Sequence, residues 1–189
     1  MPPYCDTMHD KPVILHNRTI AQTRIFHIEE VGLRFSNGTE ACYERMLGPP
    51  QGAVLIIPML DNETVLLIRE YAVGVERYEL GLPKGRIEQG EDILSAANRE
   101  IMEEIGYAAS ELEHIHSLSL APGYVGHHTH VVLARGLYPQ ERPGDEPEPI
   151  EVVPWSLHRI HELIQREDCS EARSIAALYM TRERLFNAG

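Results

Sequence analysis

The pattern of apolar and polar residues divides the chain near residue 50. From Arg24 onward, apolar residues alternate with polar ones as in a strand with one covered face, and a similar run follows Asn37-Gly38. Asn-Gly between two alternating runs is the strongest short hairpin signal, because both central positions of such a turn need positive φ. We therefore predict a β-hairpin over residues 24–46, preceded by a loose end over residues 1–16.

A cluster of glycine and proline at residues 48–52 interrupts the alternation and marks a domain boundary. A lone hairpin buries too little apolar surface to be stable by itself. The N-terminal β-strand region, residues 1–50, must therefore pack against the main domain, residues 51–189, or against another subunit.

Beyond the boundary, strand and helix patterns alternate. The apolar run 54–57 predicts a buried strand, and residues 64–68, after a turn, predict its hairpin partner. Residues 92–105 have apolar positions at helical spacing, and Gly106 is placed to end that helix. Further strands are predicted around 114–120, 129–135 and 150–155, and further helices around 156–167 and 171–187. This mixture predicts an α/β fold with a mixed sheet between helices.

Composition and charge narrow the function classes. The chain has 189 residues with 17 Lys+Arg and 29 Asp+Glu, so its formal charge is −12. This charge disfavours long nucleic acid as a partner, and no apolar run approaches the ~18 residues of a membrane helix, so no membrane partner is expected. The first residues lack the pattern of a secretion signal, and Cys5, Cys42 and Cys169 lack the spacing of a zinc site. We therefore expect reduced thiols and a cytoplasmic location.

The residues with the most informative chemistry lie on the predicted helix 92–105. Glu100, Glu103 and Glu104 have i, i+3, i+4 spacing, so their carboxylates share one face of the helix. A solvated helix face would usually interleave Lys or Arg, whereas an unscreened carboxylate cluster is what a divalent cation prefers. Arg99 lies four residues before Glu103 and can pair with it.

The segment that precedes this helix contains Gly85 and Gly90, and we expect a loop there. It leads into the helix N-terminus, where free N–H groups and the dipole favour anions. A glutamate-rich surface helix after a glycine turn would explain any one of these residues. It does not explain the whole set, which is Gly85, Glu91, Arg99, Glu100, Ile101, Glu103, Glu104 and Gly106.

The spacing of this set resembles the Nudix box. The box is a glycine, five residues, a glutamate, seven residues, Arg-Glu, an aliphatic residue, any residue, Glu-Glu, any residue, a glycine and an aliphatic residue. Only Tyr107 departs from it, as an aromatic at the last position, where we expect a core contact. Other segments resemble the ADP-ribose pyrophosphatase branch of the Nudix hydrolases; they are residues 46–71, 78–81, 121–123, 144–149 and 171–178.

The resemblance implies a Nudix α/β/α sandwich over residues 51–189. It implies Mg²⁺- or Mn²⁺-dependent hydrolysis of the pyrophosphate bond in a small nucleotide diphosphate such as ADP-ribose, a diadenosine oligophosphate or NADH, with release of AMP or a related nucleotide. It also implies a homodimer in which residues 1–50 form the dimerisation region. Two alternatives stay open: a nucleotide-sugar or nucleoside-triphosphate pyrophosphatase, and a non-catalytic ligand sensor on the same fold.

Carried over to this sequence, the resemblance makes Glu100 and Glu104 the chief metal ligands. Glu103 shares the cluster, and the carbonyl of Lys84 completes the coordination. The expected catalytic residues are Glu103, Glu100 and Arg99.

The general base and the substrate contacts are less constrained by the resemblance. The general base is either a glutamate of the Nudix box or a residue of the acidic loop before the predicted strand 150–155, Glu146 or Glu148. For Phe26, packing in the core is the favoured alternative to a substrate contact. For Lys84 and Tyr124, the alternative is an ordinary loop residue. The expected substrate contacts are Arg45, Phe26, Arg69, Glu79, Lys84 and Tyr124.

Overall fold

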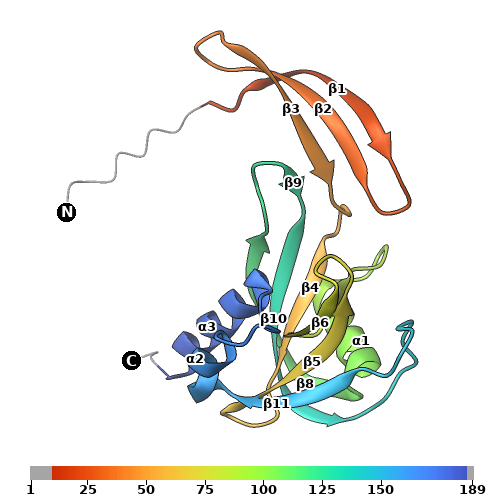
Figure 1. Ribbon diagram of the computed structural model, residues 1–189, viewed down its shortest axis with the longest axis vertical. Helices are drawn as coiled ribbons and strands as arrows, with labels where there is room; N and C mark the ends of the chain where they lie inside the picture. Colours follow the sequence, from red (N-terminus) through yellow and green to blue (C-terminus); the bar gives the residue numbers. More distant parts are fainter. Residues whose placement is uncertain (1–9, 187–189) are drawn as a thin grey trace, which may run out of the picture. The chain divides into compact units, whose positions relative to one another are not determined.

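A computed structural model of the chain describes residues 10–186 (Figure 1). The first nine residues of the predicted loose end, with Cys5, lie outside the described residues. The described chain forms two compact units. One contains residues 10–48 and 121–127, and the other contains residues 49–120 and 128–186.

The N-terminal unit is a small β-sheet. Its strands β1 (Val13–Gln22), β2 (His27–Arg34) and β3 (Glu40–Leu47) pair antiparallel in chain order, and the short β9 (Val125–Gly126) pairs parallel with β3. The predicted hairpin is β2–β3, and this prediction is confirmed. The stated reason was wrong in part, because only Gly38 of the Asn-Gly pair has positive φ, at 84°.

Strand β1 was not predicted, and its first residues, 13–16, had been assigned to the loose end. That assignment is wrong for these residues. All ten residues of β1 are exposed, and mostly polar residues follow Leu15, so the strand has no hydrophobic period that a sequence pattern could show.

The second unit contains two β-sheets. In the first, the central strands β4 (Ala53–Pro58) and β10 (His128–Pro139) are parallel. Strand β7 (Lys84–Arg86) pairs antiparallel with β4, and β8 (Tyr107–Ser119) pairs antiparallel with β10. The sheet is therefore mixed, as the sequence predicts.

The second sheet places β5 (Thr64–Ala72) between β11 (Glu151–Ser156) and β6 (Arg77–Gly81), both antiparallel to it. The prediction that residues 54–57 and 64–68 form a hairpin is wrong, because they belong to different sheets. Near the connection between them, one isolated antiparallel bridge joins Met59 and Val65. Two buried apolar runs give no information on which neighbour each will pair with.

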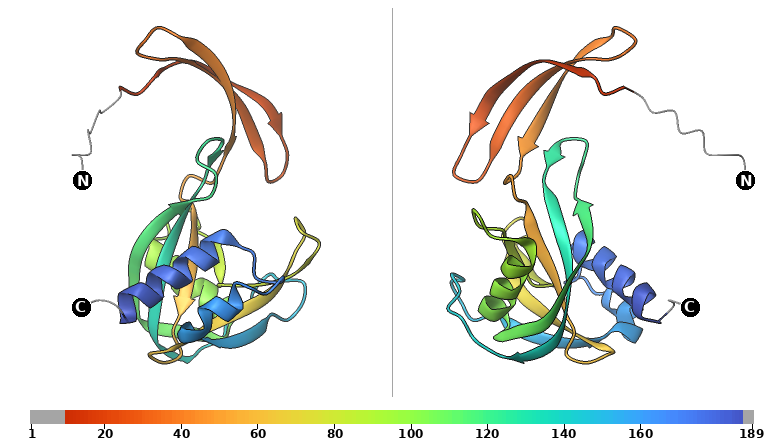
Figure 2. Two further views of the ribbon diagram at one scale, coloured as in Figure 1. Left: turned by 60° about the vertical axis from the view of Figure 1, so that its left-hand side comes forward. Right: turned by 180° about the vertical axis from the view of Figure 1, so that it is seen from behind.

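Helices cover both faces of these strands (Figure 2). Helix α1 (Ile93–Glu104) agrees with the prediction for 92–105, and α3 (Ala172–Phe186) agrees with that for 171–187. The predicted helix 156–167 is a 3₁₀ turn, Leu157–Arg159, followed by the short α2 (Ile160–Leu163). In residues 10–186, no helix is long and apolar enough to cross a membrane.

The core follows from the twofold alternation of β4. Leu55 and Ile57 belong to one buried cluster, which includes residues of α2 and α3. Val54 and Ile56 belong to a second cluster, which includes residues of α1 and has Tyr107 packed against it. Because successive strand residues point to opposite faces, one apolar run fills both layers. The predicted layering of a mixed sheet between helices is confirmed.

Candidate active site

Helix α1 begins and ends at residues that the sequence marks. The Asp92 carboxylate caps the helix by accepting hydrogen bonds from the N–H groups of Leu94 and Ser95, at 3.0 and 3.1 Å. Gly106 has φ of 74°, a left-handed conformation that suits the position after a helix end. The predicted preference of this N-terminus for an anion is met by the carboxylate of Asp92 itself. The predicted loop before it is wrong in part, because Lys84–Arg86 is strand β7.

Arg99 connects three carboxylates and is itself buried. Its guanidinium donates to Glu91 at 3.0 Å, to Glu100 at 2.7 Å and to Glu103 at 2.9 Å, and also to the carbonyl of Arg86 at 2.8 Å. These hydrogen bonds, that with Glu91 foremost, raise the pKa of Arg99. The predicted pair of Arg99 and Glu103 is confirmed. The prediction of an unscreened cluster is wrong, because Arg99 contacts two of its three carboxylates, those of Glu100 and Glu103.

Glu100 and Glu104 are buried on the side of α1 that faces β7. A Cβ on Gly85 would overlap the Glu100 carboxylate, so any larger residue there would displace this carboxylate. The backbone N–H of Lys84 donates to Glu104 at 3.0 Å. Burial raises the pKa of Glu100, and it raises the pKa of Glu104 to about 8 despite the opposing charge of Lys84. Burial therefore outweighs the contacts that favour the ionised forms, which come from Arg99 at Glu100 and from Lys84 at Glu104.

The two buried carboxylates suit a divalent cation better than Glu103 does. Arg99 and Arg142 both contact the Glu103 carboxylate, with the Nε of Arg142 at 3.1 Å. Among residues 10–186, no three His, Cys, Asp or Glu side chains already surround a common point as metal ligands would. Glu100 and Glu104 nevertheless supply hard oxygen donors, and a divalent cation would stabilise the ionised forms that burial disfavours.

An acidic cavity of about 330 Å³ adjoins these residues. Glu103 and Glu104 line one side of it, and the loop after β10 lines the other with Glu146, Glu148 and neighbouring glycine and proline residues. The charge of Glu146 contributes to the raised pKa of Glu100. The structure thus brings together the box glutamates and the two loop residues that the sequence left as alternatives for the general base.

A second cavity, of about 210 Å³, has Lys84 in its lining. The Lys84 ammonium is 2.7 Å from Glu70, which also lines this cavity. Burial alone would raise the pKa of Glu79, but hydrogen bonds from Ser170 and Arg77 outweigh it, and this pKa is lowered. The polar residues that line the cavity are Glu70, Tyr71, Glu79, Lys84, Glu171 and Ser174.

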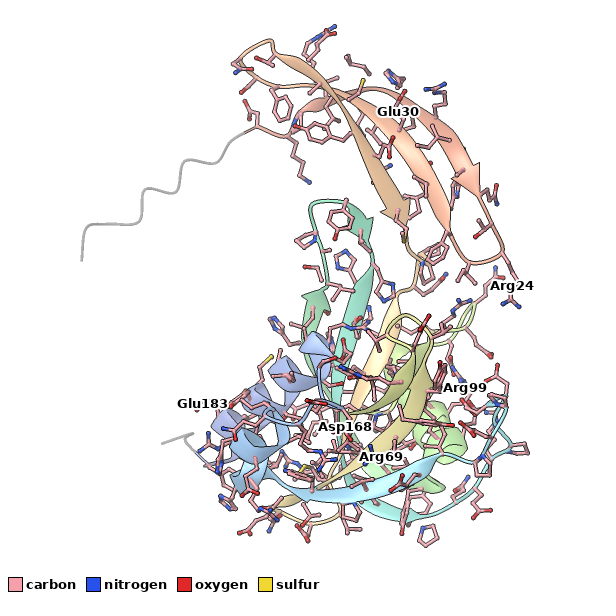
Figure 3. All side chains as sticks on the ribbon, viewed as in Figure 1. Arg24, Glu30, Arg69, Arg99, Asp168 and Glu183 are labelled. Carbon is pink, nitrogen blue, oxygen red and sulfur yellow. The ribbon has the colours of Figure 1, made fainter. Side chains whose placement is uncertain are left out.

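Arg69 is on the opposite side of β5 from Glu70, as strand alternation requires. Its guanidinium contacts Glu151 at 2.9 Å and points toward Asp168 (Figure 3). The structure therefore gives Arg69 two carboxylate partners within the protein, and a substrate phosphate would have to compete with them. Figure 3 also shows Arg99 beside α1.

The three other expected substrate contacts belong to the N-terminal unit. Phe26, in the turn between β1 and β2, is 46% exposed, so the interpretation of this residue as a core contact is wrong. Arg45 pairs with Glu29 at 3.0 Å. Tyr124 is 62% exposed.

Sequence reasoning missed two contacts, one made by Tyr78 of strand β6 and one made at the start of α3. Tyr78 on β6 reaches the acidic loop, and Ser174 on α3 accepts a hydrogen bond from the N–H of Leu82 at 3.1 Å. The short alternation of Tyr78 and Leu80 with charged residues was the available signal for β6. No comparable local signal links α3 to Leu82, because that contact joins residues far apart in the sequence.

The chain matches two known domain families. Residues 12–45 match the NudE-type Nudix hydrolase N-terminal domain, and residues 49–179 match the NUDIX domain. ADP compounds hydrolase NudE of Escherichia coli strain K12 is 46% identical over 179 residues, which cover 95% of this chain and 96% of that protein.

Two further similarities agree with these matches. ADP-ribose pyrophosphatase of Bacillus subtilis strain 168 is 30% identical over 173 residues, covering 87% of this chain and 91% of that protein. A crystal structure of an ADP compounds hydrolase matches with a TM-score of 0.89 and 45% identity, over 96% of this chain and 97% of the other. The fold of residues 49–179 is thus the one that the box residues predict.

Proposed function

The chain belongs to the Nudix hydrolase family, and from this premise we propose that it hydrolyses the pyrophosphate bond of ADP-containing compounds. The substrates are ADP-ribose, diadenosine oligophosphates or NADH, and the product is AMP or a related nucleotide. The observation that carries the proposal is the buried pair Glu100 and Glu104 on the side of α1 that faces β7, with Glu104 lining the acidic cavity. Similarity over nearly the whole chain to an enzyme named for ADP compounds supports the substrate class.

Nudix hydrolases need a divalent metal, and we propose Mg²⁺ or Mn²⁺ for this chain. Glu100 and Glu104 would hold it with the carbonyl oxygen of Lys84, and Glu103 would join them on leaving Arg142. A bound cation neutralises a pyrophosphate and makes its phosphorus easier to attack. Oxygen donors select such hard ions over zinc-like ones.

The chain's own residues supply positioning and proton transfer. Arg99 keeps Glu100 and Glu103 in place through two of its hydrogen bonds. The Lys84 ammonium binds a substrate phosphate by exchanging its contact with Glu70 for one with the ligand. A carboxylate of the acidic cavity takes the proton of the attacking water: Glu103, or in its place Glu146 or Glu148 of the loop.

Substrate recognition involves both units in this proposal. Glu79 and Lys84 contact the substrate from the smaller cavity. Arg69 contacts a substrate phosphate that displaces the carboxylate partners of this arginine. In the N-terminal unit, the exposed Phe26 and Tyr124 offer aromatic faces to an adenine ring, and Arg45 offers a planar cation.

The N-terminal sheet supports a homodimer. It exposes many apolar side chains, which are Val13, Ile14, Leu15, Ile20, Ile25, Phe26 and Tyr43. Exposed apolar surface of this extent usually marks an interaction site. Light scattering should therefore give about twice the 21.4 kDa chain mass. A monomer at micromolar concentration would contradict the dimer and leave the hydrolase proposal standing.

The location and partners follow from charge and thiols. Cys42 and Cys169 are both free, and burial raises the pKa of the Cys169 thiol to about 11. Free thiols are usual in reducing compartments, which supports a cytoplasmic location. The −12 charge opposes binding to long nucleic acid, so the proposed partner is a small nucleotide diphosphate.

A substrate panel tests the proposed function. ADP-ribose, NADH, diadenosine triphosphate, GDP-mannose and dGTP are each incubated with the protein and Mg²⁺, and the products are separated by chromatography. We expect AMP from the first three, with GDP-mannose and dGTP turned over much more slowly. A preference for dGTP or GDP-mannose would overturn the substrate class, and no turnover of any compound would overturn the enzyme.

A further inference from the structure

The acidic loop, residues 140–150, is fixed firmly at its two ends. At its start, the N–H of Gln140 donates to the carbonyl of Gly106 at 3.0 Å, and the N–H of Arg142 donates to the carbonyl of Met102 at 3.1 Å. At its end, Glu151 begins β11 and pairs with Arg69 of β5. Both ends are therefore held by regular structure.

The middle of this loop, residues 143–150, makes one hydrogen bond within the described part of the chain. In this bond, the hydroxyl of Tyr78 donates to the carboxylate of Glu148, at 2.7 Å. Glu148 lines the cavity that Glu103 and Glu104 also line. The contact therefore connects strand β6 directly to the loop wall of the acidic cavity.

Tyr78 is well placed to hold the loop. Its residue partner across the β5–β6 ladder is Tyr71, and the two rings meet edge to face at 5.4 Å between centroids. The hydrogen bond to Glu148 raises the pKa of Tyr78 above its ordinary value of 10.0. The phenol therefore remains a donor throughout the neutral range, on a ring that its neighbour helps to orient.

We propose that Tyr78 is a positioning residue, which holds Glu148 and with it residues 143–149 against the acidic cavity. It acts through Glu148 and does not touch the reacting atoms. Small displacements of a group that lines a reaction site lower the rate far more than they lower ground-state binding. The kinetic part of this inference rests on the proposed function, whereas the structural part does not.

The test uses Tyr78→Phe in the full-length protein, which removes the hydroxyl and keeps the ring. We expect kcat for ADP-ribose to fall about tenfold with KM changed by less than about twofold, the size of effect typical for one hydrogen bond to a charged group. Hydrogen exchange followed by mass spectrometry should show faster exchange in residues 140–142, where the N–H groups of Gln140 and Arg142 are hydrogen-bonded, with exchange of α1 unchanged.

Tyr179→Phe is the matched control. Tyr179 is on α3 and is 37% exposed, and its hydroxyl has no hydrogen bond within residues 10–186. Removal of this hydroxyl should leave both kcat and the exchange of residues 140–142 unchanged. Equal effects of the two substitutions would overturn the assignment to Tyr78.

A second pair of variants shows whether Tyr78 acts through Glu148. In a Glu148→Ala background, Tyr78→Phe should change kcat by no more than about twofold, because the shared contact is already lost. The same tenfold loss in both backgrounds would overturn the proposal. Glu148→Gln retains an acceptor for the phenol, so exchange of the loop should stay slow in that variant.

The two proposals fail in distinguishable ways. Wild-type protein that turns over no ADP compound would overturn the proposed function, and the exchange measurement on Tyr78→Phe would still decide the positioning role. Active protein whose loop exchange is unchanged by Tyr78→Phe would overturn the positioning role alone.

Discussion

Strand β1 of the N-terminal unit and strand β4 of the second, larger unit differ sharply in burial. All ten residues of β1 are exposed, whereas five of the six residues of β4 are buried. Strand β4 has apolar neighbours on both faces, supplied by helices of its own unit. The larger unit therefore carries its own core, and the stability of the N-terminal sheet depends on main-chain pairing and on whatever covers its apolar side chains.

The charged groups show the same difference. Arg99 in the larger unit is buried and contacts three carboxylates. In the N-terminal sheet, Arg34 pairs with Glu40 while both side chains are more than half exposed. Exposed pairs contribute little to stability, and buried charges are costly when a partner is removed. The buried charges around Arg99 therefore stabilise the larger unit, whereas the exposed pair of the N-terminal sheet contributes little to stability.

Arg99→Met should break this contrast most visibly. The substitution leaves Glu91, Glu100 and Glu103 without their shared cation, and we expect a loss of about 3–5 kcal/mol in the free energy of unfolding. Arg34→Met, the matched change in the N-terminal sheet, should cost less than about 1 kcal/mol. Urea unfolding followed by circular dichroism measures both. Similar losses for the two variants would show that the contrast in charge burial has no energetic meaning.

A pair of isoleucine truncations sharpens the comparison of the cores. Ile56 of β4 is fully buried, and Ile14 of β1 is 54% exposed. Ile56→Ala should cost about 2–5 kcal/mol at every protein concentration. Ile14→Ala should cost less than about 0.5 kcal/mol in a monomer, and should matter more where a second copy covers the sheet. Thermal unfolding at several concentrations distinguishes these cases, and a concentration-independent loss at Ile14 as large as that at Ile56 would contradict the account.

The sequence predicted the larger unit better than the smaller one for a physical reason. Helix α1 has a capping aspartate, apolar positions at helical spacing and a terminal glycine, and each of these signals is local. Strand β1 has no covered face, so its sequence has no alternation to reveal it. The pairing of β4 with β10, and not with β5, depends on contacts between distant residues.

The same limit applies to the candidate site. The spacing of Glu100, Glu103 and Glu104 on one helix predicted their proximity. Their different surroundings could not be predicted, because Arg142 and Lys84 approach from other elements. Tyr78 reaches Glu148 across 70 residues of sequence, and only the fold shows that contact.

Asp168→Asn should have a smaller effect than Arg99→Met or Ile56→Ala, and it tests a partly exposed charged contact of the larger unit. Hydrogen bonds from Arg166 and Arg69 lower the pKa of Asp168 below its ordinary value of 3.8. A lowered pKa means that the ionised form adds stability at pH values above 3.8, and that this stability is lost as the pH falls toward the folded-state pKa. We expect a cost of about 1–2 kcal/mol at neutral pH.

The pH series supplies the control for this prediction. The difference between wild type and Asp168→Asn in the free energy of unfolding should be constant from pH 7 to about pH 5 and should shrink below about pH 4. A difference that grows on acidification would contradict the sign of the shift.

The proposed role of the buried carboxylates of α1 is to bind the metal ion for pyrophosphate hydrolysis. Its most direct test is the kcat/KM for ADP-ribose with Mg²⁺, measured for wild type and for Glu104→Gln, which keeps the shape of the side chain and removes its charge. We predict AMP formation by wild type and a fall of about 100-fold or more in the variant, with the melting temperature not lowered. A variant that retains its kcat/KM within about twofold would contradict the account.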